Sequence, residues 1–299
     1  MNSGFRQLGF IGLGTMGEAI CRNLAVKSGL ATIAFDRDAA SLERAAAHGV
    51  RPGASVADAA AGSDVVFLSL PSGEVVEEVV QAPGGLLDSA RQGQIIVDLG
   101  TSPVDLTRRL SASFAERGTT LVDAPVARTR AAAEAGTLSV MVGAEPAVFE
   151  TIRGLLATFA SDITLCGPTG CGQIVKIMNN MILFQTVVAI SEAKAIGERA
   201  GVDPSLLFDA LSKGSADSFA LRNHGMKAVL LDDFPDRAFS VEYARKDLRY
   251  ALRLALETQV EALGAQTVDM WFERAVAAGE GQRYHPVVSR LIGRTGQLA

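Results

Sequence analysis

Three polar side chains lie close together in an otherwise apolar stretch between positions 170 and 201. Lys176, Asn179 and Asn180 are surrounded by isoleucine, valine, methionine and leucine. A buried polar group without a partner costs about 1–3 kcal/mol, so such side chains need internal partners or a function. Burial disfavours the charged form of an amine, which suits lysine to proton exchange near neutral pH. Asparagine donates and accepts hydrogen bonds and can therefore hold a polar ligand.

The segment from Gly172 to Gly201 has the composition of one long helix. It contains no proline, consists mostly of good helix formers and has glycine at both ends. Its apolar residues leave no clean polar stripe, which predicts a helix enclosed by protein. Lys176 and Asn180 are four residues apart and share one face. From these residues alone a second interpretation stays open, in which the lysine reaches solvent and the asparagines bond to a neighbouring helix.

A glycine-rich loop follows the first apolar segment. Residues 8–11 (LGFI) resemble a short strand, residues 12–17 have the pattern GxGxxG, and a helical segment continues to about Ser28. In this context the glycines permit a tight turn, close approach of a pyrophosphate and close packing of helix on sheet. The pattern predicts a dinucleotide site made by Gly12, Leu13, Gly14, Thr15, Met16 and Gly17.

An acidic residue ends the second predicted strand. Asp36 follows Gly17 by 19 residues, a position where a carboxylate can bind both hydroxyls of an adenosine ribose. The same charge would repel a 2′-phosphate, so we expect NAD as the cofactor and NADP as less suitable. Arg37 leaves this preference open, because its guanidinium can either accept such a phosphate or lie in solvent.

Short apolar segments alternate with helical ones up to position 165. Strands are predicted near position 50 and at 64–69, 95–99, 120–123, 136–143 and 162–165. This alternation predicts an α/β Rossmann-like domain with a doubly wound parallel sheet. Ligands of such sheets bind beyond the carboxyl ends of the strands, which adds Leu70, Pro71 and Thr101 to the predicted cofactor site. Alternatively, these loops supply only turns and helix caps.

The sequence from 167 to 170 (GPTG) marks a predicted boundary, because only helical segments follow it. We predict a dinucleotide-binding domain over residues 1–168 and an all-α domain over residues 169–299 for substrate binding and oligomerisation. The long helix would join them. Apolar segments at 248–256 and 268–272 favour a homodimer or homotetramer over a monomer.

Composition disfavours several classes of partner. The chain of 299 residues has a net charge of −5, which is unsuited to nucleic acid or an anionic membrane. Its three cysteines and three histidines have no spacing typical of a metal site or disulfide framework, so we expect no metal and reduced thiols in the cytoplasm. We also expect no secretory leader and no membrane span, because polar residues interrupt the long apolar helix.

Four motifs together resemble the β-hydroxyacid dehydrogenases, which include 3-hydroxyisobutyrate dehydrogenase and tartronate semialdehyde reductase. The motifs are FIGLGTMGEAICRNL (10–24), DAPV with GTLSVMVGA (123–144), GCGQIVKIMNN (170–180) and KDLRYAL (246–252). The resemblance covers nearly the whole chain and implies an active site in the cleft between a Rossmann domain and a helical domain. It implies that Lys176 is the general acid/base, that Asn180, with Asn179 beside it, holds the substrate, and that Lys246 lies beside the cofactor.

The chemistry of the residues agrees with this assignment. Removing a hydride from an alcohol requires a base for the hydroxyl proton, and Lys176 is the candidate because no histidine is near it in the sequence. Two other activities stay open: an imine reductase, and an NAD-binding regulatory protein without turnover. Lys176 counts against the first, since imine reductases resemble this chain but generally lack a lysine at its position. The presence of Lys176, Asn180 and Lys246 together counts against the second.

One loop departs from the family pattern. Most members have Ser-Gly-Gly after DAPV, where this chain has Ala127, Arg128 and Thr129. The loop resembles the Gly-Arg-Thr loop of 3-sulfolactaldehyde reductases, in which arginine and threonine meet a sulfonate. We therefore expect Arg128 to bind the anion of a short 3-hydroxy acid or its semialdehyde, either a sulfonate or a second carboxylate. Alternatively, Arg128 lies in solvent and backbone N–H groups bind the carboxylate of 3-hydroxyisobutyrate, tartronate semialdehyde or succinic semialdehyde.

Overall fold

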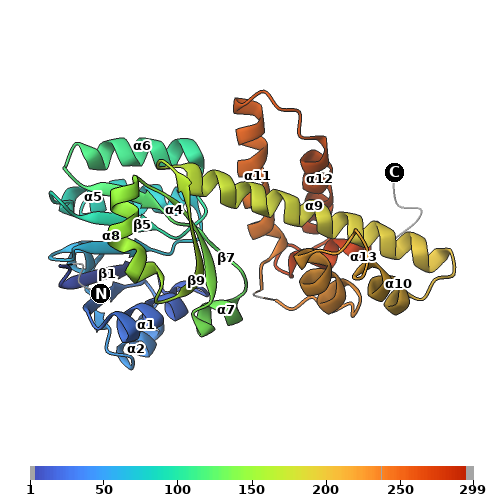
Figure 1. Cartoon of the computed structure of the whole chain (residues 1–299), viewed down its shortest axis with the longest axis horizontal. Helices are drawn as coiled ribbons and strands as arrows, with labels where there is room; N and C mark the ends of the chain where they lie inside the picture. Colours follow the sequence, from blue (N-terminus) through green and yellow to red (C-terminus); the bar gives the residue numbers. More distant parts are fainter. Residues whose placement is uncertain (1–3, 237, 294–299) are drawn as a thin grey trace. The chain divides into compact units, whose positions relative to one another are not determined.

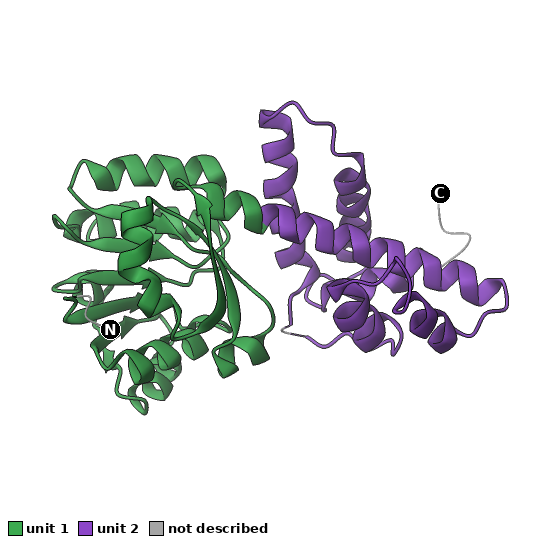
Figure 2. Cartoon of the chain, viewed as in Figure 1, with its two compact units in different colours: residues 1–176 green, residues 177–299 purple. Residues whose placement is uncertain are grey.

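The computed structural model describes residues 4–236 and 238–293. It divides the chain into two compact units, residues 1–176 and residues 177–299 (Figure 2). The boundary predicted at position 168 lies about two helical turns earlier. The long helix therefore begins within the first unit and continues into the second.

The first unit contains, within its described residues, a nine-stranded sheet with helices between the strands (Figure 1). The strands are β1 (Gln7–Ile11), β2 (Ala31–Phe35), β3 (Arg51–Pro52), β4 (Val65–Leu68), β5 (Ile95–Asp98), β6 (Thr120–Asp123), β7 (Val126–Ala127), β8 (Leu138–Gly143) and β9 (Ala160–Gly167). The helices are α1 (Gly17–Ser28), α2 (Ala39–Ala46), α3 (Val56–Ala60), α4 (Gly73–Gln81), α5 (Leu86–Ser89), α6 (Val104–Ala115), α7 (Arg130–Ala135) and α8 (Pro146–Leu156).

The order of the strands is β3-β2-β1-β4-β5-β6-β8-β7, and β9 pairs with β8. The strands from β1 to β6 are parallel, and the last residues of β1, β4, β5 and β6 are neighbours in register. Their carboxyl ends therefore meet at one edge. The predicted Rossmann-like, mainly parallel sheet is confirmed. The antiparallel pairing of β8 with β6 and β7 was not predicted, because the sequence pattern of a strand does not encode its direction.

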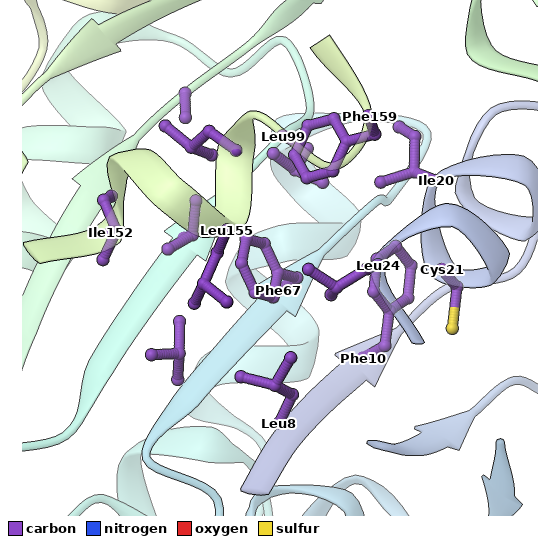
Figure 3. Packing of buried hydrophobic residues seen from close by; sticks show 14 of the residues in the cluster. Leu8, Phe10, Ile20, Cys21, Leu24, Phe67, Leu99, Ile152, Leu155 and Phe159 are labelled. Carbon is purple, nitrogen blue, oxygen red and sulfur yellow. The ribbon is translucent and has the colours of Figure 1, made fainter. Parts of the chain in front are cut away.

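Apolar side chains on the sheet and helices α1 and α8 form one core of the first unit (Figure 3). Phe10 and Phe67 stack at 6.2 Å between ring centroids, and Phe159 contacts Phe67 edge-on at 6.3 Å. Burial of each such ring stabilises the fold by about 1.5–3 kcal/mol. Cys21 lies in this core, and burial raises the pKa of its thiol to about 12. The thiol is therefore protonated and inert, in agreement with its predicted reduced state.

The described part of the second unit is helical, as predicted. It contains most of α9 (Cys171–Arg199), then α10 (Pro204–Leu211), the π-helix η1 (Leu221–Val229), α11 (Val241–Glu257), α12 (Leu263–Ala277), the 3-10 helix η2 (His285–Val288) and α13 (Ser289–Ile292). The π-helix lies where an α-helix was expected. Among the described helices, α9 alone has the length and hydropathy to cross a membrane, a weak indication because core helices of soluble proteins have the same properties.

The apolar segments on α11 and α12 are divided between the core and the surface. They were expected to face another subunit, and Leu248, Val268 and Phe272 are buried in the core of their own unit. Exposed apolar side chains remain on both helices, including Leu256 and Met270, so burial against another subunit stays a prediction. A stripe of apolar residues in the sequence is the same whether an element packs on its own chain or on a partner, so the pattern could not distinguish the two.

His285 lies in an aromatic cluster in this core and is fully buried. Its ring centroid is 5.2 Å from that of Phe184, 5.4 Å from that of Phe239 and 5.1 Å from that of Tyr284. Burial, with a smaller contribution from His224, lowers the pKa of His285 well below 6.5; burial also lowers the pKa of His224 to about 4. The unfolded chain binds these protons more readily, so stability is present above pH 6.5 and is lost as the pH falls toward 4.

We expect the substitution His285→Phe to reduce this dependence on pH. The phenyl ring keeps the aromatic packing and removes one buried titratable group, whose contribution is at most about 1.4 kcal/mol per pH unit. Urea unfolding at pH 8 and pH 5 should show a smaller loss of unfolding free energy for the variant than for the wild type. His48→Gln, at an exposed histidine, should keep the wild-type dependence. An unchanged dependence in His285→Phe would contradict the assignment.

Candidate active site

The glycine loop joins β1 to α1 at the carboxyl edge of the sheet. Gly12 has φ +95°, and a Cβ there would lie 2.3 Å from the carbonyl oxygen of Ser69. A Cβ on Gly17 would lie 2.1 Å from the carbonyl oxygen of Gly12. By contrast, Gly14 is exposed, and a Cβ there would meet nothing within 4 Å. The first and third glycines are required by packing, whereas the second leaves the backbone open to a ligand.

The N-cap residue of helix α1 is Met16, whose side chain makes no capping hydrogen bond. The backbone N–H groups at such a helix start are suited to a phosphate. Asp36 follows β2, where its Oδ2 accepts a hydrogen bond from the backbone N–H of Leu13 at 2.5 Å. Arg37 is exposed. Asp36 therefore braces the glycine loop, and the whole arrangement fits a dinucleotide.

Two further loops leave the same edge of the sheet. Leu70 is half-buried and Pro71 exposed after β4, and Thr101 is buried after β5. Asp98 fixes the second loop: it accepts hydrogen bonds from the backbone N–H of Gly100 and from the hydroxyl of Ser102, both at 2.9 Å. The parallel register of β1, β4 and β5 thus brings these loops to the edge that carries the glycine loop.

The start of α9 is bonded to the ends of β5 and β6. Asp123 is fully buried at the end of β6. Its Oδ1 accepts a hydrogen bond from the backbone N–H of Gly170 at 2.6 Å, and its Oδ2 accepts one from that of Gln173 at 2.8 Å. The Gln173 side chain donates to the carbonyl of Gly100 at 2.9 Å and accepts from the backbone N–H of Ser102 at 3.0 Å. Burial raises the pKa of Asp123 to about 6, while the backbone N–H groups oppose this shift.

Lys176 follows Gln173 by about one helical turn and is 9% exposed. The anchored turn fixes its backbone at the end of the first unit. About one turn further along α9, in the second unit, Asn180 is 1% exposed and Asn179 is exposed. Asn179 donates through Nδ2 to Oδ1 of Asn180 at 3.1 Å. The ammonium of Lys246 lies 4.1 Å from the ring centroid of Tyr243.

The loop that was expected to meet the substrate anion has other partners. Ala127 ends β7 and pairs with Ser139 of β8, and the hydroxyl of Thr129 caps α7. Arg128 has φ +88°. Its guanidinium donates to the carbonyl of Thr137 at 2.6 Å, to the hydroxyl of Ser161 at 2.8 Å and to a carboxylate oxygen of Asp162 at 2.7 Å. Arg128 is thus exposed and already paired with a carboxylate. Whether it also meets a substrate anion stays a prediction.

Sequence comparison identifies the family. Residues 7–167 match the family model described as the NAD binding domain of 6-phosphogluconate dehydrogenase, and residues 170–292 match that described as NAD-binding of NADP-dependent 3-hydroxyisobutyrate dehydrogenase. The chain belongs to the β-hydroxyacid dehydrogenase family. It is an NAD(P)-dependent oxidoreductase that acts on the CH–OH group of hydroxy acids.

Individual relatives cover nearly the whole chain. It is 36% identical to 2-(hydroxymethyl)glutarate dehydrogenase of Eubacterium barkeri, over 92% of this chain and 91% of that protein. It is 34% identical to 2-hydroxy-3-oxopropionate reductase of Escherichia coli (strain K12), over 96% and 97% of the two chains. The structure of 3-hydroxyisobutyrate dehydrogenase from Mycobacterium tuberculosis with L-serine is similar with a TM-score of 0.88, 29% identity and coverage of 97% and 99%.

Three polar residues were given no role from the sequence. They are Asp123 and Gln173 in the first unit, and Asp247 in the second unit, which accepts a hydrogen bond from Asn180. Each lies inside a motif that indicated the family, which was the available signal. Their partners are distant along the chain: 47 residues separate Asp123 from Gly170, and 67 separate Asn180 from Asp247. No local pattern identifies such pairs.

We expect Asp123→Asn to destabilise the protein. An amide has one acceptor oxygen, so one of the two backbone N–H groups at the start of α9 would face a donor, at a cost of about 1–3 kcal/mol. Denaturant unfolding at pH 8 measures this cost. Asp38→Asn is the control, because Asp38 is an exposed N-cap of α2 and asparagine caps helices equally well. Equal unfolding free energies of Asp123→Asn and the wild type would contradict the anchoring role.

Proposed function

We propose that this protein transfers a hydride between NAD(H) and a short anionic 3-hydroxy acid or its semialdehyde, with Lys176 as the general acid/base. The observation that carries the proposal is the placement of Lys176. It is a nearly buried lysine whose backbone is fixed by the anchored turn of α9 to the strand ends that carry the cofactor loops. A base needs such a fixed position to meet one hydroxyl proton.

The cofactor would be held by the glycine loop at its pyrophosphate and by Asp36 at its adenosine ribose. When bound, it accepts the hydride of the alcohol in one direction and supplies it in the other. Lys176 accepts the hydroxyl proton during oxidation and returns a proton to the carbonyl oxygen during reduction. The charge of Asp36 would repel the 2′-phosphate of NADP and so favours NAD. Exposed Arg37 has the opposite effect, because its guanidinium can bind that phosphate.

A carboxylate and a hydroxyl on the β-carbon are the features of the proposed substrate class. Relatives named for 2-(hydroxymethyl)glutarate, 2-hydroxy-3-oxopropionate and 3-hydroxyisobutyrate support it, since all three compounds have a carboxylate two carbons from the reacting oxygen. Arg128 favours either a second carboxylate on such a substrate or a sulfonate in place of its carboxylate. The pairing of Arg128 with Asp162 supports the simpler alternative, a substrate with one carboxylate bound by the loop backbone.

We also propose a cytoplasmic homo-oligomer. The exposed residues of α9 include Val175, Ile182, Ala189 and Ile196, which recur every seven residues and so follow one face of the helix. Such an apolar face favours a second copy of the chain as its partner. The net charge of −5 disfavours nucleic acid and anionic membranes.

We expect Lys176→Ala to lose turnover by a factor on the order of 10² or more, because no base would accept the hydroxyl proton. The affinity for NADH, measured by fluorescence titration, should stay close to that of the wild type. Lys194→Ala is the matched control: it lies on the same helix and pairs with Glu198, and its turnover should be unchanged. A near-normal turnover number for Lys176→Ala would refute the assigned role.

Arg128→Gly tests the substrate anion, because glycine adopts φ +88° without strain. Initial rates should be compared for 3-sulfolactaldehyde, 2-(hydroxymethyl)glutarate and 3-hydroxyisobutyrate. If the guanidinium binds a sulfonate or a second carboxylate, kcat/KM for the first two should fall about tenfold or more, as expected for loss of a charge-assisted hydrogen bond. Asp162→Asn should increase kcat/KM for both, because it removes the competing carboxylate.

The control for this series is Arg130→Ala. Arg130 lies two residues after Arg128, is exposed and pairs with Glu134. It should leave all three rates unchanged. If 3-hydroxyisobutyrate is the best substrate and Arg128→Gly changes no rate, the loop acts through its backbone, and the alternative with one carboxylate is correct.

A further inference from the structure

A buried carboxylate lies among the polar side chains of the second unit. Asp247 belongs to α11 and is 1% exposed. Removing a carboxylate from water is unfavourable unless it gains partners of opposite charge or hydrogen-bond donors. The family resemblance implies that the preceding residue, Lys246, lies beside the cofactor, whereas no role was predicted for Asp247.

The two oxygens of Asp247 face two different groups. Oδ2 accepts a hydrogen bond from Nδ2 of Asn180 at 2.7 Å. Oδ1 lies 3.1 Å from the ammonium of Lys246, and the geometry of that contact is ionic rather than that of a hydrogen bond. One carboxylate therefore connects the asparagine on α9 with the lysine on α11.

An ionised carboxylate fixes which way the Asn180 amide points. It only accepts hydrogen bonds, so the NH₂ group must face it and the carbonyl oxygen must face away. Asn179 supports this orientation from the other side, because its Nδ2 donates to Oδ1 of Asn180. The NH₂ group of Asn180 is thus held by an acceptor and its carbonyl oxygen by a donor. The second N–H and the remaining lone pair of the amide therefore point in fixed directions.

The same carboxylate supplies a charge for Lys246, whose ammonium also lies over the ring of Tyr243. A neighbouring ion pair that involves α11 is more exposed to solvent. Arg245 and Asp269 join α11 to α12 at 2.8 Å, and both are more exposed than Asp247. That pair links two helices of the same unit and serves as an internal reference.

We propose that Asp247 is a positioning residue of the reaction, which holds the Asn180 amide in one orientation and the Lys246 ammonium beside it. This inference rests on the proposed function, together with the roles that the family resemblance implies for Asn180, which would hold the substrate, and for Lys246, which would lie beside the cofactor. Asp247 acts through these two side chains and exchanges no proton with the substrate.

A double-mutant cycle between Asp247→Ala and Asn180→Ala tests the proposal. Each single variant should lose kcat/KM for the hydroxy acid by about tenfold or more, as expected when a charge-assisted hydrogen bond is removed. If Asp247 acts through Asn180, the double variant should lose little more than Asn180→Ala alone. If Asp247 has only an independent structural role, the two losses should multiply.

Asp247→Asn separates the two contacts. Asparagine retains an oxygen that can accept from Asn180 at nearly the same volume, but it lacks the charge next to Lys246. We therefore expect the KM for the hydroxy acid to change less than the dissociation constant for NADH. Should Asp247→Ala fail to fold, Asp247→Leu takes its place in the cycle, because leucine has a similar volume and accepts no hydrogen bond from Asn180. Asp269→Asn is the control and should keep kcat/KM within about twofold of the wild type.

The outcomes separate this inference from the function on which it rests. If Asn180→Ala keeps the wild-type kcat/KM, the substrate-holding role of Asn180 is wrong, and with it this part of the proposed function. If Asn180→Ala loses activity but Asp247→Ala keeps it, or if their losses multiply, the proposed function stands and the positioning role of Asp247 is overturned.

Discussion

The geometry of the site depends on one carboxylate, Asp123, which binds the start of a 29-residue helix. Its two oxygens accept hydrogen bonds from the backbone N–H groups of Gly170 and Gln173. Asp123 therefore acts as the N-terminal cap of this helix, although it lies far from the helix in the sequence. The space around it is filled: a Cβ on Gly172 would lie 2.8 Å from Oδ2, and a Cβ on Gly143 would lie 2.3 Å from Oδ1. The glycines of two separate motifs are therefore required by the same buried carboxylate.

This anchor explains how Lys176, the proposed general acid/base, can have a fixed position on a helix. A side chain one turn beyond a doubly bonded helix start has a backbone that cannot drift relative to the strand ends. The Gln173 side chain adds two bonds to the loop after β5, and that loop is itself fixed by Asp98. A substitution far from the reacting atoms, at Asp98 or Asp123, would thus move Lys176 without touching it.

The fold could be predicted largely from local patterns. Strand and helix positions follow from alternation and periodicity, and the glycine loop from its spacing between a strand and a helix. The direction of β8 could not be predicted, because pairing with β6 and β7 decides it. The same limit applies to the site: Lys176 is conspicuous within its own helix, whereas Asp123 and Asp247 are identified only by partners 47 and 67 residues away.

Arg128 is the residue whose presence stability does not explain. A side chain other than glycine at φ +88° carries backbone strain of about 1–3 kcal/mol. Its main partner, Asp162, is 56% exposed, and ion pairs at exposed positions contribute little because solvent and salt screen them. Glycine at this position would avoid the strain. The fold alone therefore gives little reason for an arginine at this position, and the carboxylate of Asp162 would compete with a substrate anion for its guanidinium.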